Sequence, residues 1–220
     1  MTPDLVIFDC DGVLVDSEPI VNRAHATALT GCGYPITADD LVDRFCGLSD
    51  ADMFAIIERE RGCALPLSYA ALVGDIIEQQ FRRSLRAIFG VREVLDALPS
   101  ARCVASSSTH DMIRRKLELT GLSPCFGEML FSAEMVSRGK PAPDLFLHAA
   151  AQMDVAPARC VVVEDSAAGI TAARTAGMAA IGFCGGGHCR PGHAERLRAC
   201  GAVLVIAEMG ELADAISRLP

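Results

Sequence analysis

Acidic residues that directly follow two short apolar runs are the side chains of this 220-residue chain most able to do chemistry. Asp9 and Asp11 follow the first run, and Glu164 and Asp165 follow a later one. Four carboxylates brought together would repel each other by ~1–4 kcal/mol per close pair. A hard cation with oxygen ligands relieves that repulsion, and Mg²⁺ typically also binds substrate phosphate oxygens. The acids therefore predict a magnesium site that serves a phosphorylated substrate.

Asp9 and Asp11 can divide the work of phosphoryl transfer between them. One carboxylate can attack phosphorus and form an aspartyl phosphate. The other can protonate the leaving alcohol and then deprotonate water, a role worth ~10²–10⁴ in rate. Gly12 allows the sharp turn that brings both side chains to one place. Taken alone, this Asp-Cys-Asp-Gly segment fits a polar turn after a strand equally well.

Two further segments offer groups that can hold phosphate oxygens. Residues 106–109, all Ser or Thr, follow an apolar run and precede a helical stretch, whose first backbone N–H groups bind anions. The same residues also fit a plain helix N-cap. Pro141 and Pro143 stiffen the loop that carries Lys140 and can aim it inward. The upstream glycine of a nucleotide-binding phosphate loop is missing, so this segment does not predict ATP binding.

Apolar runs separated by helical stretches predict the elements that position these groups. Runs typical of buried parallel strands lie at 5–8, 102–105, 129–131, 160–163, 179–183 and 202–206. Helical stretches among the later runs lie at 111–120, 143–153, 166–176 and 208–219. This alternation predicts an α/β fold with a doubly wound parallel sheet. Ligands bind such a sheet beyond the carboxyl ends of its strands, where the acids and serines lie.

Residues 17–88 interrupt the alternation, because they contain amphipathic helical stretches and no convincing strand. The stretches lie at 19–30, 38–45, 50–61 and 68–85. We therefore predict a core domain of residues 1–16 and 89–220 that carries an inserted helical domain of residues 17–88, placed as a lid.

Composition excludes several classes of function. A net charge of -8, 5% aromatic residues and no Trp disfavour nucleic-acid binding. No apolar run reaches the ~18 residues of a membrane span, and the first residues lack the basic start of a signal peptide. We therefore expect no membrane association and a cytoplasmic location, with the ten cysteines reduced. Nothing in the sequence predicts the oligomeric state.

The segment 184–193 contains Cys184, His188, Cys189 and His193, which could suggest a soft metal site. Zinc ligands usually come as two closely spaced pairs, and the second pair is missing here. The three consecutive glycines at 185–187 favour a flexible loop instead.

Together the chemical segments resemble the four signature motifs of the haloacid dehalogenase superfamily, in order and across essentially the whole chain. The segments are FDCDGVLVDSE, VASSS, GKPAPD and VVVEDSAAG. The resemblance implies Asp9 as nucleophile and Asp11 as acid and base. It also implies a Mg²⁺ site formed by these two residues with Glu164 and Asp165.

The resemblance assigns phosphate binding to Ser106, the amide of Ser107 and Lys140. It implies that the helical block is a cap of the C1 type, whose loops contact the leaving group. Arg44 and Gly47 lie at a helix end in that block, and we expect them to contact the substrate. Simple capping of the helix is the alternative.

Within the superfamily the chain looks like the branch of phosphoglycolate phosphatases, β-phosphoglucomutases and sugar phosphatases, nearest to 6-phosphogluconate phosphatase-type members. Dehalogenases lack the second aspartate, so Asp11 favours phosphoryl transfer. The mutases carry a cap His and Arg where this chain has Val21 and Asp50. We therefore expect a Mg²⁺-dependent phosphatase whose partner is a small phosphorylated metabolite, a sugar phosphate or a phosphoglycolate-like ester. A phosphomutase and a non-enzymatic module phosphorylated on aspartate are the alternatives.

Overall fold

The computed structural model describes residues 3–45 and 50–219, without the side chains of residues 50 and 51. The chain forms two compact units, one of residues 1–16 and 86–220 and the other of residues 17–85. The predicted boundary at 88 differs because residues 86–88 belong with the first unit. The amide of Asp16 donates to the carbonyl of Arg86 (3.0 Å), and the amide of Ile88 donates to the carbonyl of Leu14 (2.9 Å).

The first unit is built on one parallel sheet, as predicted. Its strands run in the order β3-β2-β1-β4-β5-β6, and every neighbouring pair is parallel. The strands are β1 (Leu5–Phe8), β2 (Ala101–Ser106), β3 (Leu130–Ser132), β4 (Cys160–Glu164), β5 (Ala179–Phe183) and β6 (Leu204–Ile206). The α/β fold class is confirmed.

Strand β1 lies where the direction of winding reverses, because the chain runs from it to β2 on one side and later to β4 on the other. Phe8, the last residue of β1, is paired with Val104 of β2 and Val163 of β4. The carboxyl ends of the three strands therefore lie side by side, and ligands bind parallel sheets at such a switch point.

Helices cover both faces of the sheet. They are α5 (Val91–Ala97), α6 (His110–Thr120), α7 (Ser123–Phe126), α8 (Asp144–Gln152), α9 (Ala167–Thr175), α10 (His193–Cys200) and α11 (Leu212–Ser217), with 3₁₀ turns at Ala133–Met135, Pro157–Arg159 and Met209–Glu211. Helices α5, α7 and α10 were not predicted from the sequence. Each spans only 4 to 8 residues, which is too short for a clear helical period, and packing rather than propensity stabilises such helices.

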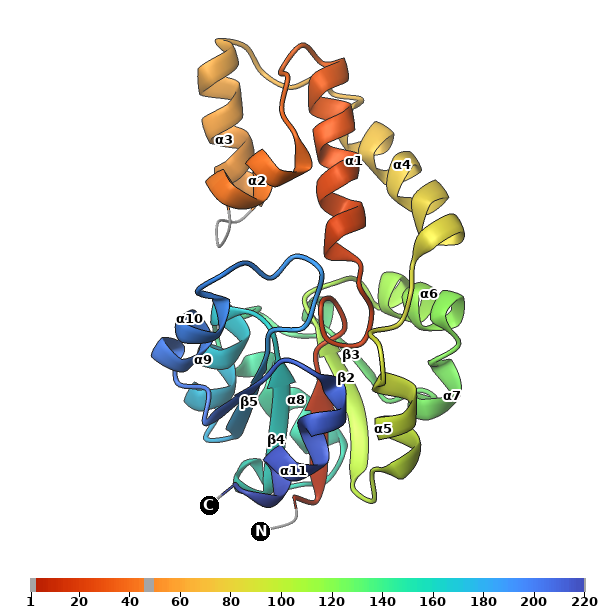
Figure 1. Ribbon diagram of the computed structural model, residues 1–220, viewed down its shortest axis with the longest axis vertical. Coiled ribbons are helices and arrows are strands. Elements are labelled where there is room, and N and C mark those ends of the chain that lie inside the picture. The colour runs from red at the N-terminus through yellow and green to blue at the C-terminus, as the bar shows by residue number, and fades with distance from the viewer. Residues whose placement is uncertain (1–2, 46–49, 220) are drawn as a thin grey trace. The chain divides into compact units, whose positions relative to one another are not determined.

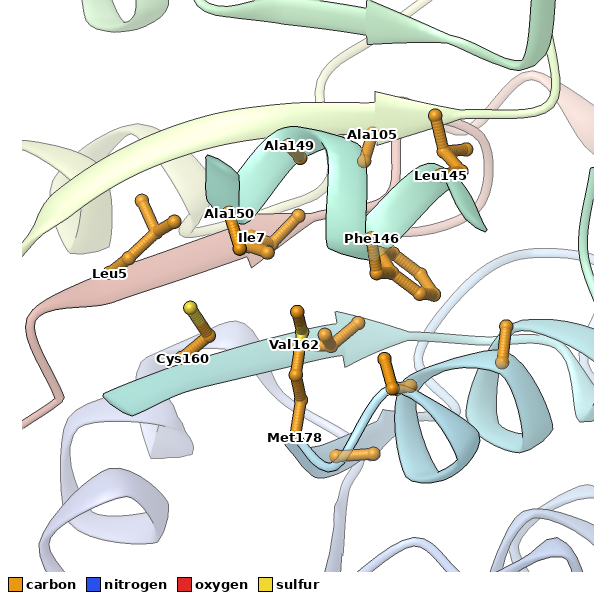
Figure 2. Packing of buried hydrophobic residues seen from close by; sticks show 14 of the residues in the cluster. Leu5, Ile7, Ala105, Leu145, Phe146, Ala149, Ala150, Cys160, Val162 and Met178 are labelled. Atoms are coloured by element: carbon orange, nitrogen blue, oxygen red, sulfur yellow. The ribbon is translucent and has the colours of Figure 1, made fainter. Parts of the chain in front are cut away.

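Alternate residues of β1 pack against the two helical layers, because side chains alternate across a strand. Leu5 and Ile7 belong to an apolar cluster with Phe146 and Ala149 of α8, and Figure 2 shows these side chains converging between helix and sheet. Phe8 points to the opposite face, where its ring meets the ring of Phe126 edge-on at 6.0 Å. All of these side chains are buried, so β1 is held from both sides.

The second unit is helical and has its own core. Its helices are α1 (Glu18–Gly31), α2 (Ala38–Phe45), α3 (Asp50–Arg61) and α4 (Tyr69–Ser84), labelled in Figure 1. Leu29, Ile57 and Val73 are among its buried residues. The described residues from 17 to 85 contain no strand, in agreement with the helical pattern of the sequence. In the described part of the chain, no helix is both long and apolar enough to cross a membrane.

Candidate active site

Asp9 follows β1 at the switch point and is held by a buried lysine. The amide of Asp9 continues the sheet by donating to the carbonyl of Val163 (3.0 Å). Its Oδ1 atom lies 2.6 Å from Nζ of Lys140, and the Asp9 residue is only 6% exposed. Burial raises the pKa of the Asp9 carboxyl well above its usual range, although Lys140 lowers it. The neighbouring carboxylates of Glu164 and Asp165 raise this pKa further.

Lys140 reaches the strand ends from the loop that precedes α8. Its Nζ atom donates to Asp9, to Oε1 of Glu164 (2.6 Å) and to the carbonyl of Ala105 (3.0 Å). Burial alone would lower the pKa of this ammonium group, but the two carboxylates raise it above its usual range. Lys140 therefore stays charged and brings the ends of β1, β2 and β4 together.

Glu164 uses both carboxylate oxygens inside the protein. Oε1 accepts from Lys140, and Oε2 accepts from the amide (2.7 Å) and the hydroxyl (2.9 Å) of Ser166. The side chain is 1% exposed. A Cβ atom on Gly169 of α9 would collide with this carboxylate, so the helix approaches closely only because residue 169 has no side chain. These hydrogen bonds fix Glu164 against Lys140, and the metal-ligand role expected of Glu164 from the sequence stays a prediction.

Asp165 lies beside the backbone of Gly12 and is contacted by two imidazoles. Oδ2 of its carboxylate is 3.1 Å from Nε2 of His188, and its carbonyl oxygen is 2.7 Å from Nε2 of His193. A Cβ atom on Gly12 would overlap the carboxylate, and the φ of +74° at Gly12 also favours glycine. Burial raises the pKa of Asp165, whereas the hydrogen bond from His188 lowers it.

Asp11 is paired with a cation that the sequence analysis did not single out. Lys116 of α6 is 4% exposed, and its Nζ atom lies 2.5 Å from Oδ1 of Asp11. The hydroxyl of Ser108 donates to Oδ2 of Asp11 (2.8 Å), and Lys116 also donates to this hydroxyl (2.9 Å). Burial lowers the pKa of Lys116, but Asp11 outweighs it and raises the value above the usual range. A lysine in a charged helix gives no sequence signal of burial, so only the fold identifies it.

The serine segment after β2 lies at the same edge of the sheet. Ser106 is 1% exposed, and its Oγ atom accepts from the amide of Ser108 (3.2 Å). Ser107 is exposed. Thr109 caps α6, because its hydroxyl accepts from the amide of Met112 (3.3 Å). Ser106 and Ser107 come before the N-cap residue of α6, so neither of them caps this helix.

Arg44 of the helical unit is engaged in an ion pair. Its Nη2 atom lies 2.7 Å from Oε1 of Glu60, and its Nη1 atom donates to the hydroxyl of Tyr34 (2.9 Å). The side chain is 42% exposed, and the two partners raise the pKa of its guanidinium. Gly47, also expected to contact substrate, lies outside the described residues.

The segment 184–193, for which the sequence favoured a flexible loop, brings three potential metal ligands together. Ligand-type atoms of His188, Cys189 and His193 all lie within 4.8 Å of one another. The loop is anchored by the amide of Gly187, which donates to Oδ1 of Asp16 (2.9 Å). Burial opposes a charge on His188, but its bond to Asp165 raises its pKa to about 11. Burial raises the pKa of Cys189, and the two histidines outweigh it and lower the value to about 7.

The carboxylates at the strand ends fit a hard divalent cation. Asp9 and Asp165 are buried, and repulsion among carboxylates raises the pKa of both. The Asp165 carboxylate packs directly against Gly12, where a Cβ atom would overlap it, and so lies beside the turn that follows Asp9. Oxygen donors under mutual repulsion are the set that Mg²⁺ satisfies.

The comparison with known proteins agrees with this geometry. The model of the haloacid dehalogenase-like hydrolases matches residues 3–177. The chain belongs to this family. It is a phosphoric monoester hydrolase, as its motifs predicted.

Three relatives illustrate the family. The 6-phosphogluconate phosphatase of Escherichia coli is 33% identical over 189 residues, which cover 86% of each chain. A haloacid dehalogenase-like protein of unknown function from Agrobacterium tumefaciens is 41% identical, with a TM-score of 0.89 over 97% of each chain. A family hydrolase from Deinococcus radiodurans, solved with bound phosphate and sodium, is 30% identical, with a TM-score of 0.83 over 98% of this chain and 96% of that one.

Proposed function

We propose that this protein is a Mg²⁺-dependent phosphatase that hydrolyses a small phosphorylated carbohydrate through a phosphoaspartate on Asp9. The observation that carries the proposal is the buried Asp9 carboxylate, held 2.6 Å from Lys140 at the switch point of the sheet. The activity named for the Escherichia coli relative supports the substrate class. The phosphate bound to the Deinococcus relative supports an anion site in this fold.

In the first half-reaction, a carboxylate oxygen of Asp9 attacks phosphorus and the bond to the leaving oxygen breaks. Lys140 offsets the negative charge of the transferring group, and Ser106 and the amide of Ser107 bind its oxygens. Asp11 enters this step in its protonated form and donates its proton to the leaving oxygen, which departs as the alcohol. Lys116 and Ser108 hold the Asp11 carboxylate in place.

In the second half-reaction, Asp11 takes a proton from water as the water attacks phosphorus. The bond between phosphorus and the Asp9 oxygen then breaks, which releases inorganic phosphate, frees the Asp9 carboxylate and leaves Asp11 protonated, as it was at the start of the cycle. The same side chain thus serves as acid and then as base, and each proton is accounted for.

The side chains that would hold Mg²⁺ are those of Asp9 and Asp165. Mg²⁺ would supply positive charge at the phosphoryl oxygens and orient them for in-line attack. We assign Glu164 to positioning Lys140, because both of its carboxylate oxygens already accept hydrogen bonds. The carboxylate of Asp11 is likewise bound by Lys116 and Ser108.

The helical unit is proposed as the cap that recognises the leaving group. The helical content of residues 17–85 supports this assignment, together with the family to which the chain belongs. Arg44 is the cap side chain that we assign to substrate contact, in exchange with its partner Glu60.

Asp9→Asn tests the proposal, because the two side chains are nearly isosteric. We expect the folded variant to lose turnover of a chromogenic phosphate ester by at least about 100-fold.

Wild-type activity should vanish in chelator and return with Mg²⁺, but return poorly with Ca²⁺, whose larger and looser shell suits a different geometry. Among sugar phosphates, phosphoglycolate and nucleotides, we expect the sugar acid and sugar alcohol phosphates to be preferred. Full activity of the folded Asp9→Asn variant would exclude this mechanism.

A further inference from the structure

Beyond the carboxylate site, the described residues contain a second set of ligand-type side chains. His188, Cys189 and His193 come from the loop after β5 and the start of α10, and their ligand-type atoms lie within 4.8 Å of one another. Sγ of Cys189 is 3.6 Å from Nε2 of His188. The two imidazole rings are nearly perpendicular (87°), with centroids 5.6 Å apart.

His193 has the outer hydrogen bond that is typical of a metal-binding histidine. Its Nε2 atom is 2.7 Å from the carbonyl oxygen of Asp165, which can only accept a hydrogen bond. A neutral ring that donates through Nε2 carries its lone pair on Nδ1. In metal sites, ligating histidines almost always donate their second nitrogen to a carbonyl or carboxylate, which fixes the tautomer.

His188 and Cys189 contribute the other donors of the cluster. His188 is held between the backbones of Gly12 and Gly186, where a Cβ atom on either glycine would crowd its ring. Its Nε2 atom faces Sγ of Cys189 and also contacts the Asp165 carboxylate, whereas its Nδ1 atom is buried and has no hydrogen-bond partner among the described residues. A thiol next to two imidazoles readily becomes the thiolate, which is the form that binds metal.

From these contacts we propose a second metal site, in which His188, Cys189 and His193 bind a transition metal ion such as Zn²⁺. One thiolate and two imidazoles suit Zn²⁺ and Co²⁺, and they are poor ligands for Mg²⁺. Metal displaces the protons carried by these groups, so binding releases protons and strengthens as pH rises.

The second site adjoins the first through Asp165. His188 contacts the Asp165 carboxylate and His193 contacts its carbonyl. An ion bound to the two histidines therefore changes the charge next to a proposed Mg²⁺ ligand. This consequence rests on the proposed function, whereas the binding itself does not.

Cobalt binding tests the site without any enzyme assay. The reduced full-length protein is titrated with Co²⁺ in excess Mg²⁺, which keeps the oxygen site occupied. We expect one equivalent to produce thiolate-to-cobalt charge-transfer absorption in the near ultraviolet, and Zn²⁺ to displace it. Cys189→Ser and His193→Gln should each weaken binding by about 100-fold or more, and Gln can still donate to the Asp165 carbonyl.

Cys184→Ser is the matched control, because Cys184 lies in the same segment and its thiol donates to the carbonyl of Ile206 (3.4 Å). This variant should bind Co²⁺ like the wild type, and circular dichroism should show that all variants are folded. The proposal is overturned by absence of the absorption in wild type, by its persistence in folded Cys189→Ser, or by its loss in folded Cys184→Ser.

Activity gives a separate readout of the coupling. Equimolar Zn²⁺ should lower the Mg²⁺-saturated rate of the wild type and of Cys184→Ser, but should leave the rate of Cys189→Ser at its own zinc-free value. Equal inhibition of the three proteins would place the effect of zinc at the oxygen site. An inactive enzyme that still binds Co²⁺ would contradict the proposed function and leave the metal site standing.

Discussion

Asp11 acquires its position from Lys116 and Ser108, which lie on the segment that follows β2. Nζ of Lys116 is 2.5 Å from the Asp11 carboxylate, and the Lys116 side chain is 5% exposed. A buried charge pair is costly to break, because removing one partner leaves the other without compensation. Lys116 is therefore a positioning residue for the proposed acid and base.

Lys116→Met should lower kcat by about 10- to 100-fold, because displacement of a catalytic group by about 1 Å has effects of that size. KM should change little, and Lys116→Arg should recover part of the rate. A double-mutant cycle with Asp11→Ala gives the check, since residues in contact are not additive. If Lys116→Met lowered the rate of Asp11→Ala as much as that of the wild type, the coupling would be absent.

Helix α9 approaches β4 through a glycine, and this contact is a feature of whole elements. Gly169 has no side chain where a Cβ atom would collide with the Glu164 carboxylate. Glu164 contacts Lys140. A displacement of the Glu164 carboxylate would therefore also displace Lys140, which contacts Asp9.

Gly169→Ala should therefore lower both kcat and the melting temperature, even though alanine is the better helix former. Gly74 of α4 is the control, because a Cβ atom there meets nothing within 4 Å. Gly74→Ala should raise the free energy of unfolding of its unit by about 0.5–1 kcal/mol. Thermal melts and steady-state kinetics of the two variants measure both effects. An active, stabilised Gly169→Ala would contradict the close approach.

Helices α2 and α3 are linked by the exposed pair of Arg44 and Glu60. Such pairs are worth about 0–1 kcal/mol, so the link costs little to open. If Arg44 contacts the leaving group, Arg44→Met should raise KM for the preferred sugar phosphate several-fold. Glu60→Gln, which weakens the same ion pair but keeps the arginine, should leave KM unchanged or lower it. Equal KM values for Arg44→Met and wild type would limit Arg44 to a structural role.

At the scale of the whole molecule, the outcome of the phosphoenzyme depends on which hydroxyl group reaches it. A mutase must retain a bisphosphate and exclude water, which calls for cationic groups on the helical unit. At the positions expected for those groups this chain has Val21 and Asp50, and the side chain of Asp50 lies outside the described residues.

We therefore expect single-phosphate sugars to yield inorganic phosphate in stoichiometric amounts, with no need for a sugar bisphosphate. A phosphate-release assay run alongside product analysis by nuclear magnetic resonance makes the distinction. Isomerisation of a hexose 1-phosphate without phosphate release, or absolute dependence on a bisphosphate, would identify a mutase instead. Asp11→Ala should slow both half-reactions and leave any phosphoenzyme that forms long-lived.

The sequence by itself determined the parallel α/β fold, the helical insertion and the sheet edge that we propose as the active site. Strand-length apolar runs followed by Asp9, Ser106 and Glu164 were enough, because the carboxyl ends of parallel strands meet at one edge of a sheet. Lys140 was also found from sequence, since two prolines mark its loop as stiff. These inferences depend on local residue patterns and on the alternation of strands and helices, both of which can be inferred from the order of residues in the chain.

Only the tertiary structure determined which side chains contact the acidic residues of the site. Lys116 meets Asp11 across 105 positions of sequence, and nothing in a charged helix marks one lysine as buried. His188 and His193 reach Asp165 from a loop and a short helix that only packing defines. Pairing across such separations is selected by burial and charge compensation in the folded chain. The local pattern of residues therefore does not predict these pairs.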